Sequence, residues 1–387
     1  TESYKQTENE PMIIRRAKAF QHILENIPIT IRDLELVVGS STLAPRGCQT
    51  FPEFSYEWLE AEFDTVETRS ADPFYISEQT KKELKEANAY WKGRTTSDLA
   101  TAYMEPETLL DIEHNIFTPG NYFYNGVGHV TVKYWEVLEI GYEGIMAKAQ
   151  AELDHCNVGD GDYAERSRFL EAVIMSCQAV IDYANRYAKL ALEMAEKCTD
   201  PQRKAELLVI ASNCSKVPAK GAANFWEACQ SFWFVQQLLQ MESSGHSISP
   251  GRFDQYMYPF YKHDIEAGTI TVDRVFELIC SLYMELNEPK MRTVQSLAVG
   301  GICCESGEDA CNDLSKLCLE AMSTLKTPYP NMSARVMPGK TPDWFYDEIM
   351  RTVKAGCGQP MVLNDAVWVP NLTSLGIPEK WARDYYN

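Results

Sequence analysis

Two short segments, each with one histidine among glycines and small polar residues, are the parts of this sequence best suited to chemistry. The first is GNYFYNGVGHV, residues 120–130, in which three aromatic residues, two asparagines and three glycines surround His129. Gly126 and Gly128 permit backbone angles that other residues avoid, so we expect a tight turn that sets His129 at the edge of a strand. An imidazole there can move a proton near neutral pH, although a lone histidine is more often a packing or surface residue.

The second segment is ESSGHSISPGRFDQY, residues 242–256, which is dense in hydroxyl groups and follows a very apolar stretch. Buried hydroxyls are costly unless they are hydrogen-bonded, so the segment either pairs within itself or faces a polar ligand. In the first case Arg252 and Asp254 would form a structural ion pair. In the second, His246 and Ser247 are suited to hold hydroxyl groups. We then expect His129 and Ser247 to face one cavity, with Asn121 and His246 within reach.

The elements around these segments are mainly helical. Apolar residues recur at helical spacing in residues 10–27, 163–197 and 200–214, the last with Asp200 as the cap and Pro201 at the first position. Residues 224–242 are apolar on every side, which predicts a buried helix.

Three apolar runs predict strands. A short strand is expected at Leu36 to Val38, and the segments SLAVGG (296–301) and PMVLND (360–365) are expected to be neighbouring interior strands packed near the helix from Phe225 to Met241. Because no linker or repeat divides the chain, residues 1–387 are interpreted as a single unit in which helices wrap a few buried strands.

Composition excludes several classes of partner. The chain has 36 Lys and Arg against 55 Asp and Glu, a formal charge of -19, which disfavours nucleic acid and does not attract an anionic membrane. No apolar run approaches ~18 residues and no signal peptide is present, so no membrane segment is predicted. The twelve cysteines are scattered, mostly in helical patterns, as in a reduced cytoplasmic protein. CxxC, HExxH and HxxxH are absent, so no metal site is predicted.

Several long motifs resemble glycyl radical enzymes of the pyruvate formate-lyase-like superfamily. They are GNYFYNGVGHVTV, GHSISPGRFDQYMYPFY, PMIIRRAKAF, LNDAVWVP and ARDYYN, and the resemblance covers essentially all 387 residues. It is closest to the dehydratase and lyase branch, which includes the coenzyme B12-independent glycerol and propanediol dehydratases. The resemblance implies an α/β fold: a barrel of ten strands in two five-stranded halves, sheathed in helices. This chain would supply the N-terminal helices and the first half.

The resemblance also implies radical chemistry. In the family, a backbone glycyl radical oxidises a cysteine whose thiyl radical takes hydrogen from the substrate, and the activated substrate then loses a leaving group. An activating enzyme that uses S-adenosylmethionine and an iron-sulfur cluster installs the radical, and the enzyme itself carries no bound metal or other cofactor. A homodimer is implied for the intact enzyme.

Residue by residue, Asn121 and His129 match the Asn and His that face the diol in glycerol dehydratases, and His246 and Ser247 match the Gly-His-Ser segment there. Choline lyases resemble this branch but carry Tyr and Asp at the first two positions, and hydroxyproline dehydratases carry Phe at the first. The set therefore favours elimination of water from a neutral diol or polyol, with His129 as the catalytic residue that donates to the departing hydroxyl.

Two departures leave the substrate open. After Glu288 the longer stretch with a Gly-Tyr-Pro turn, usual in dehydratases, is missing, and Lys133 stands where several relatives have Asp. Another lyase of the superfamily, which breaks a C–N, C–S or C–C bond or resembles formate acetyltransferase, is an alternative. A non-catalytic fragment is a third. The thiyl cysteine, the catalytic glutamate and the radical glycine find no match here, so we expect a truncated sequence that is inactive alone.

Overall fold

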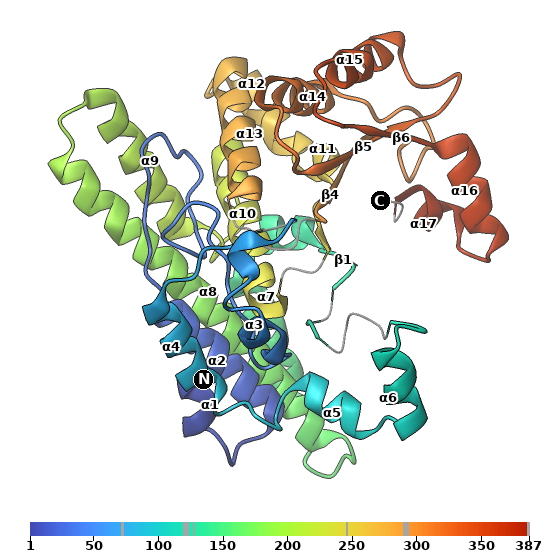
Figure 1. The fold of residues 1–387 in the computed structure, drawn as a ribbon. Coiled ribbons are helices and arrows are strands. Elements are labelled where there is room, and N and C mark those ends of the chain that lie inside the picture. The colour runs from blue at the N-terminus through green and yellow to red at the C-terminus, as the bar shows by residue number, and fades with distance from the viewer. Residues whose placement is uncertain (71–72, 119–123, 127, 245–246, 289–293, 385–387) are drawn as a thin grey trace.

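The computed structural model describes residues 1–387 except 71–72, 119–123, 127, 245–246, 289–293 and 385–387 (Figure 1). The helices are α1 (Glu2–Gln6), α2 (Met12–Asn26), α3 (Glu57–Ala61), the 3-10 helix η1 (Val66–Thr68), α4 (Glu78–Asn88), α5 (Thr96–Ala102), α6 (Pro106–Glu113), α7 (Tyr134–Asp154), α8 (Tyr163–Lys197), α9 (Pro201–Lys216), α10 (Phe225–Ser243), α11 (Phe253–Tyr256), α12 (Tyr258–Ala267), α13 (Val272–Asn287), α14 (Asp313–Leu325), α15 (Asp343–Lys354), α16 (Asp365–Ser374) and α17 (Glu379–Asp384). The strands are β1 (Val130–Thr131), β2 (Ile248–Ser249), β3 (Gly251–Arg252), β4 (Ser296–Gly300), β5 (Asn331–Val336) and β6 (Met361–Asn364).

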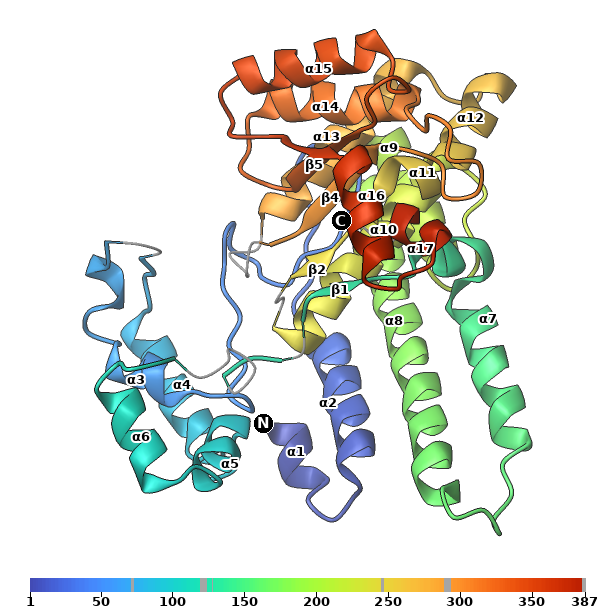
Figure 2. The same ribbon diagram turned by 90° about the vertical axis from the view of Figure 1, so that its right-hand side faces the viewer.

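A layer of long helices supports the strands. Figure 2 shows α2, α8 and α7 running side by side, with the strands above them. The predicted helices all form, and at the start of α9 the Asp200 side chain accepts a hydrogen bond from the amide of Gln202, as expected for the cap. Helix α10 is buried along almost its whole length, which confirms the interpretation of its apolar sequence.

The strands are all parallel, which together with the helices confirms the helix-rich α/β class. One sheet pairs β1 with β2, and the other has the order β3-β4-β5-β6. The chain from Ile248 to Arg252 belongs to both sheets, since its first two residues pair with β1 and its last two pair with β4. Pro250 lies between these pairs and has no amide hydrogen to donate. The strands therefore follow in five positions, the number expected for the first half of the barrel.

The prediction that residues 296–301 and 360–365 form neighbouring interior strands is wrong in two respects. Strand β5 lies between β4 and β6, and β6 is at the edge of the sheet, where Met361 is 58% and Val362 51% exposed. Of the two predicted strands, β4 alone is interior, with Leu297 and Val299 fully buried. Helix α10 shares the main hydrophobic core with β4, as expected.

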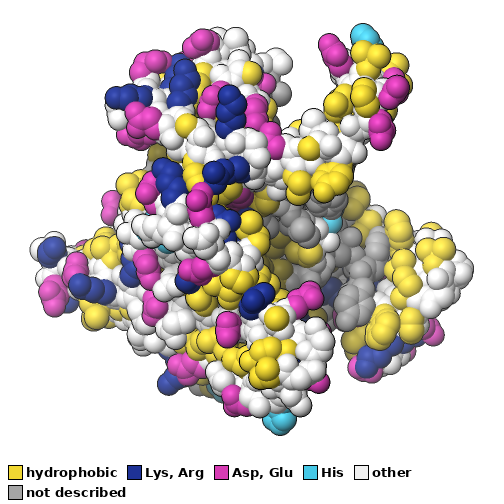
Figure 3. Space-filling model, turned by 90° about the horizontal axis from the view of Figure 1, so that it is seen from below, with side chains coloured by type: hydrophobic (Ala, Val, Ile, Leu, Met, Phe, Trp, Pro, Cys, Tyr) yellow, Lys and Arg dark blue, Asp and Glu magenta, His cyan; other side chains and the backbone are white. Residues whose placement is uncertain are grey.

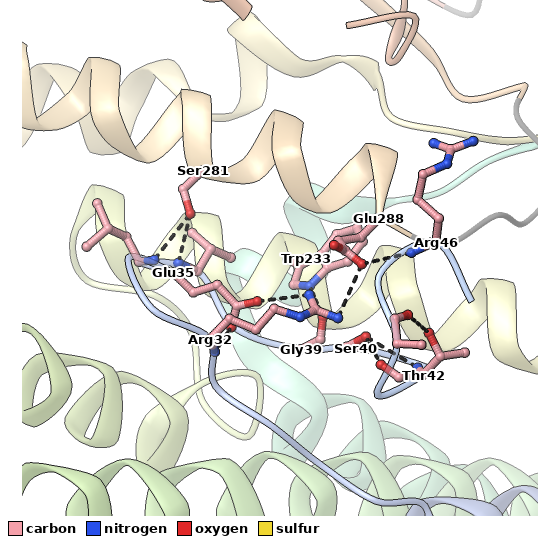
Figure 4. Close-up of polar contacts among 12 residues, drawn as sticks. Arg32, Glu35, Gly39, Ser40, Thr42, Arg46, Trp233, Ser281 and Glu288 are labelled. Atoms are coloured by element: carbon pink, nitrogen blue, oxygen red, sulfur yellow. Dashed lines mark hydrogen bonds and ion pairs between the residues drawn. The ribbon is translucent and has the colours of Figure 1, made fainter. Parts of the chain in front are cut away.

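Residues Leu36 to Val38 do not form the predicted strand, although they are buried. Side chains replace a strand partner (Figure 4). The amides of Leu36 and Val37 donate to Ser281 Oγ at 3.2 and 3.3 Å. Gln230 bonds both the amide (2.9 Å) and the carbonyl (2.7 Å) of Val38. These side chains satisfy backbone groups of the segment, which bends at Leu36 and Val37 and joins no ladder.

A buried ionic network ties the C-terminal helices to the sheet. The guanidinium of Arg335 on β5 and the carboxylate of Asp365 at the start of α16 are both fully buried, with Nε–Oδ1 3.0 Å and Nη2–Oδ2 3.1 Å. Arg335 also donates to the carbonyl of Arg383 in α17 at 2.7 Å. These bonds satisfy charges that would otherwise be costly inside the protein.

Helices α5 and α6 form an arm on the other side of the strands. No residue of either helix is buried, and the two helices expose several large apolar side chains. From below, a hollow is visible between this arm and the C-terminal elements, and yellow side chains gather on the arm (Figure 3). Of the residues the structure describes, none belongs to a helix long and apolar enough to cross a membrane.

Candidate functional site

The parallel pair β1–β2 brings the two glycine-rich segments together. Val130 is in register with Ile248 and Thr131 with Ser249, so His129 and Ser247 stand at the matching positions just before the two strands. The amide of Val130 donates to the carbonyl of Ser247 at 3.2 Å. The backbones at His129 and Ser247 are thus neighbours. A second bond between the two segments, from the amide of Gly126 to Ser244 Oγ, joins residues that are 118 positions apart in the sequence.

Gly126 allows another part of the chain to approach closely, as glycine at this position was expected to do. A Cβ atom on Gly126 would lie 2.5 Å from the carbonyl oxygen of Ser243 at the end of α10. Its amide donates to Ser244 Oγ at 3.2 Å. Gly251 is also closely approached, because a Cβ atom there would lie 2.9 Å from the Thr131 methyl. In addition, its φ is +68°. Larger residues would push the two segments apart, so these glycines set the spacing of the site.

The two described site residues share an unusual backbone conformation. His129 has φ 55° and Ser247 has φ 57°, in the left-handed region that residues with a Cβ adopt infrequently. His129 is exposed, whereas Ser247 is 4% exposed. Left-handed residues reverse the chain direction over a short distance and concentrate at functional sites. The other two predicted site residues, Asn121 and His246, lie outside the described residues, as does Gly245.

The hydroxyl-rich segment is neither fully self-paired nor held by the ion pair considered above. Arg252 donates to the carbonyl of Ile302 at 2.8 Å and contacts Asp384 at 3.5 Å. Asp254 accepts from the amide of Gly300 at 2.7 Å and from the hydroxyl of Ser315. Burial raises the pKa of the Asp254 carboxyl, and these bonds oppose that rise. Arg252 and Asp254 therefore anchor the strand end to the end of β4, to Ile302 just after it and to helix α14.

Lys133, the departure noted beside the site, is exposed at the start of α7. Its amine lies 2.8 Å from Glu136 Oε2, one turn along the helix. Together with Lys148, it lowers the pKa of the Glu136 carboxyl by hydrogen bonding. The Lys133 amine is thus part of a surface ion-pair group on α7.

Two pockets lie behind the strand pair, on the helical side. One, of about 340 Å³, is lined by α1, α2 and residues 49–53. The other, of about 500 Å³, lies between α2, α7, α8 and α10 and is mostly apolar. Glu242 borders both, and His129 and Ser247 line neither. The hollow in Figure 3 is on the other side, between the arm and the C-terminal elements.

The cysteines and the possible metal ligands of the described residues are further candidates for a functional site. None of the twelve cysteines, all of which lie in the described part of the chain, forms a disulfide. Burial raises the pKa of the Cys177 thiol to about 12 and that of Cys280 to about 11, so these act as packing residues. At Cys303, hydrogen bonds from Ser306 lower the thiol pKa. Within the described residues, no group of three or more His, Cys, Asp or Glu side chains is placed to hold a metal ion.

The buried glutamines of α10 were not singled out as site residues from the sequence. Gln236 is fully buried, and its Nε2 donates to the carbonyl of Ile248 in β2 at 2.9 Å. The available signal was the recurrence of Gln at positions 230, 236, 237 and 240 in an otherwise apolar helix. A buried amide needs partners, so each of them indicates a nearby backbone or side chain that it bonds.

Known proteins match the chain over its whole length. The family model described as "Pyruvate formate lyase-like" matches residues 1–387. Among solved structures, one of 1,2-propanediol dehydration in Roseburia inulinivorans has TM-score 0.95 and 55% identity, over 99% of this chain and 47% of that one. The glycerol-bound B12-independent glycerol dehydratase of Clostridium butyricum has TM-score 0.94 and 48% identity, over 99% of this chain and 50% of that one.

Curated relatives give a similar result at lower identity. A (2S)-3-sulfopropanediol dehydratase of Klebsiella oxytoca is 35% identical over 100% of this chain and 49% of its own length. The chain thus spans about half the length of the curated relatives it matches.

Proposed function

Because the chain belongs to the pyruvate formate lyase-like family of glycyl radical enzymes, we propose that the whole protein eliminates water from a small diol or polyol. The observation that carries the proposal is the 55% identity, over 99% of the chain, with the structure of 1,2-propanediol dehydration. The structure of hydroxyproline dehydratase from Clostridioides difficile, which acts on a different hydroxylated substrate, is 30% identical over the same share of the chain.

The roles proposed for the site residues follow from their chemistry. Loss of a hydroxyl group is easier when it departs as water, and the His129 imidazole can donate the proton. Ser247 carries a hydroxyl that can donate to or accept from a substrate hydroxyl, and Asn121 and His246 would add an amide and a second imidazole. The matching positions of His129 and Ser247 before β1 and β2 support this assignment.

We propose that the reaction proceeds through a glycyl radical, as in the family to which the chain belongs. When present, the glycyl radical allows hydrogen abstraction from the substrate carbon. We propose that an activating enzyme with S-adenosylmethionine and an iron-sulfur cluster installs it. We further propose that the intact enzyme is a homodimer that works in the cytoplasm. The residues of this chain would hold the diol, exclude water and protonate the departing hydroxyl.

Testing the proposal requires the complete protein, produced without oxygen together with its activating enzyme and S-adenosylmethionine. With propane-1,2-diol, loss of one water gives propanal, which can be measured by its reduction with NADH and alcohol dehydrogenase. Glycerol, hydroxyproline and isethionate serve as competing substrates. Formation of the aldehyde from propane-1,2-diol or from glycerol supports the proposal. A glycyl radical signal in electron paramagnetic resonance with no aldehyde from either of these two compounds would contradict it.

A further inference from the structure

Buried glutamines connect strand β2 to the interior of the protein. Gln236 uses all of its amide hydrogen-bonding groups: Nε2 donates to the carbonyl of Ile248 and to Gln295 Oε1, both at 2.9 Å, and Oε1 accepts from the hydroxyl of Tyr134. Gln236 and Tyr134 are fully buried. An amide with every group bonded in a dry environment has one preferred position, because each lost bond would leave a polar group unpaired.

Gln295 extends this connection to the four-stranded sheet. Its Oε1 also accepts from Gln240, and its Nε2 donates to the carbonyl of Leu286 at the end of α13 at 3.0 Å. Its backbone amide donates to Asn331 Oδ1 at the start of β5 at 3.0 Å. Gln295 directly precedes β4. The amide of Gln236 is thus fixed by the sheet on one side and holds β2 on the other.

The hydrogen bonds of Gln236 hold β2 next to the candidate site. Ile248, whose carbonyl receives the bond from Gln236, directly follows Ser247. Ser247 is in the left-handed conformation, and its carbonyl accepts from Val130, the residue after His129. Pro250 lies between β2 and β3 and has no amide hydrogen to donate, and beside it the side chain of Gln236 links β2 to Gln295.

We propose that Gln236 is a positioning residue for the site: by holding the Ile248 carbonyl it fixes the turn at Ser247 and the distance between Ser247 and His129. This inference rests on the proposed function only for its effect on catalysis. Gln236 does not touch substrate in this account. It acts through β2, and Tyr134 and Gln295 orient its amide.

The same helix offers a matched control. Gln230 is also fully buried and also bonds the backbone of a segment that is distant in the sequence, at Val38. Gln230→Leu and Gln236→Leu therefore remove equivalent groups from one helix, but only Gln236 bonds β2. General loosening of α10 would affect both variants alike.

The test is amide hydrogen exchange of the complete protein, with and without propane-1,2-diol, followed by kinetics. Without diol, Gln236→Leu should make peptides within residues 247–252 exchange about tenfold faster, as expected for loss of hydrogen bonds worth a factor of ten, and should leave 296–300 unchanged. Gln230→Leu should affect residues 36–40 instead. The diol should protect residues 247–252 from exchange in the wild type and in Gln230→Leu, but not in Gln236→Leu. The KM of Gln236→Leu for the diol should rise about tenfold, with kcat changed less.

Tyr134→Phe removes one hydroxyl and provides a second variant that is expected to fold. It should accelerate exchange at 247–252 about threefold, since it frees the Gln236 amide without deleting it. Unchanged exchange at 247–252 in both Gln236→Leu and Tyr134→Phe, or equal acceleration there by Gln230→Leu, would overturn the proposal. If the complete protein dehydrates no diol, the proposed function fails, but the exchange without diol still decides whether Gln236 holds β2.

Discussion

The sheet β3-β4-β5-β6 and the pair β1–β2 are both parallel, yet different groups hold them together. In the sheet, β4 and β5 pair over five consecutive residues, and the interior side chains are buried. The pair has two residues in each strand, and its surroundings are a histidine and a serine with positive φ, closely packed glycines and a buried glutamine. Strand β1 is exposed at both residues.

This difference separates stability from chemistry. A long backbone ladder with a dry core contributes to the free energy of unfolding but leaves little room for a ligand. A short pair held by side chains adds little to that free energy and can present polar groups. We therefore expect substitutions in the sheet to act on unfolding and substitutions in the pair to act on turnover.

The largest effect on stability is expected from Arg335→Met in β5. The substitution leaves the Asp365 carboxylate buried without its partner, which should lower the free energy of unfolding by about 3–5 kcal/mol in urea titrations. The double variant Arg335→Met/Asp365→Leu should recover most of this loss. Lys340→Met, which breaks an exposed pair with Glu308, should cost less than about 1 kcal/mol. Equal losses in the free energy of unfolding from Arg335→Met and Lys340→Met would show that the buried pair in the sheet matters no more for stability than an exposed one.

The pair should respond in the opposite way. His129→Ala in the complete enzyme should lower kcat about 100-fold, because the imidazole proposed to protonate the departing hydroxyl is lost, while the unfolding midpoint changes little. His129→Asn, which tolerates the left-handed backbone, should lose the same activity. His155→Ala at the exposed end of α7 is the control. Wild-type turnover in His129→Asn would show that His129 only packs.

The pH dependence of unfolding should come in part from the core beside the sheet, at Glu285 in α13. Burial, assisted by Glu35, raises the pKa of this carboxyl well above its usual range. The folded protein therefore holds a proton that the unfolded chain releases, so stability falls as pH rises from the unfolded pKa to the folded one. The slope for one proton is about 1.4 kcal/mol per pH unit.

Glu285→Gln should remove that part of the slope and raise stability at the upper end of the window relative to the wild type. Urea unfolding at half-unit steps between pH 4.5 and 8 measures it. Glu277→Gln, an exposed position on the same helix, is the control and should leave the slope unchanged. If Glu285→Gln and the wild type have parallel profiles, Glu285 does not titrate as described.

The smallest effect is expected far from both regions, at the start of α9. Asp200→Ala removes the side chain that accepts from the Gln202 amide at 2.9 Å and should cost about 1 kcal/mol, measured by urea unfolding. Asp200→Asn keeps an acceptor and should cost less. Neither should change kcat. A large loss of turnover in Asp200→Ala would mean that the helical layer affects catalysis at the β1–β2 pair as well as stability.

The helices were the most predictable part of the fold. Residues Tyr163 to Lys197 repeat apolar side chains over many turns, and α8 has those bounds. Strand β5 was missed because Asn331, Ser333 and Arg335 break its apolar pattern. Arg335 is tolerated only because Asp365, thirty residues later, neutralises it. A local pattern does not contain that information, so β4 and β6 were predicted to be neighbours.

The site shows the same limit. The glycines near His129 predicted irregular backbone, but nothing in their spacing predicts that β1 pairs with β2. The joint assignment with Ser247 came from the polar, glycine-rich character of both segments and from family resemblance. The failed strand at Leu36 to Val38 has a similar cause, because Ser281 and Gln230 replace a strand partner from distant positions. Interactions between side chains and distant backbone leave no periodic trace in the sequence.

The interruption at Pro250 has an evolutionary consequence. Apart from changes to proline, a substitution leaves the donors and acceptors of a backbone ladder in place, whereas a link made of glutamine and tyrosine side chains can be altered one substitution at a time. Since β2 is joined to the interior at this point through such side chains, the spacing of the pair can drift while β3 and β4 keep their register. Related proteins can thus differ in the spacing of the β1–β2 pair while the sheet that stabilises the fold stays the same.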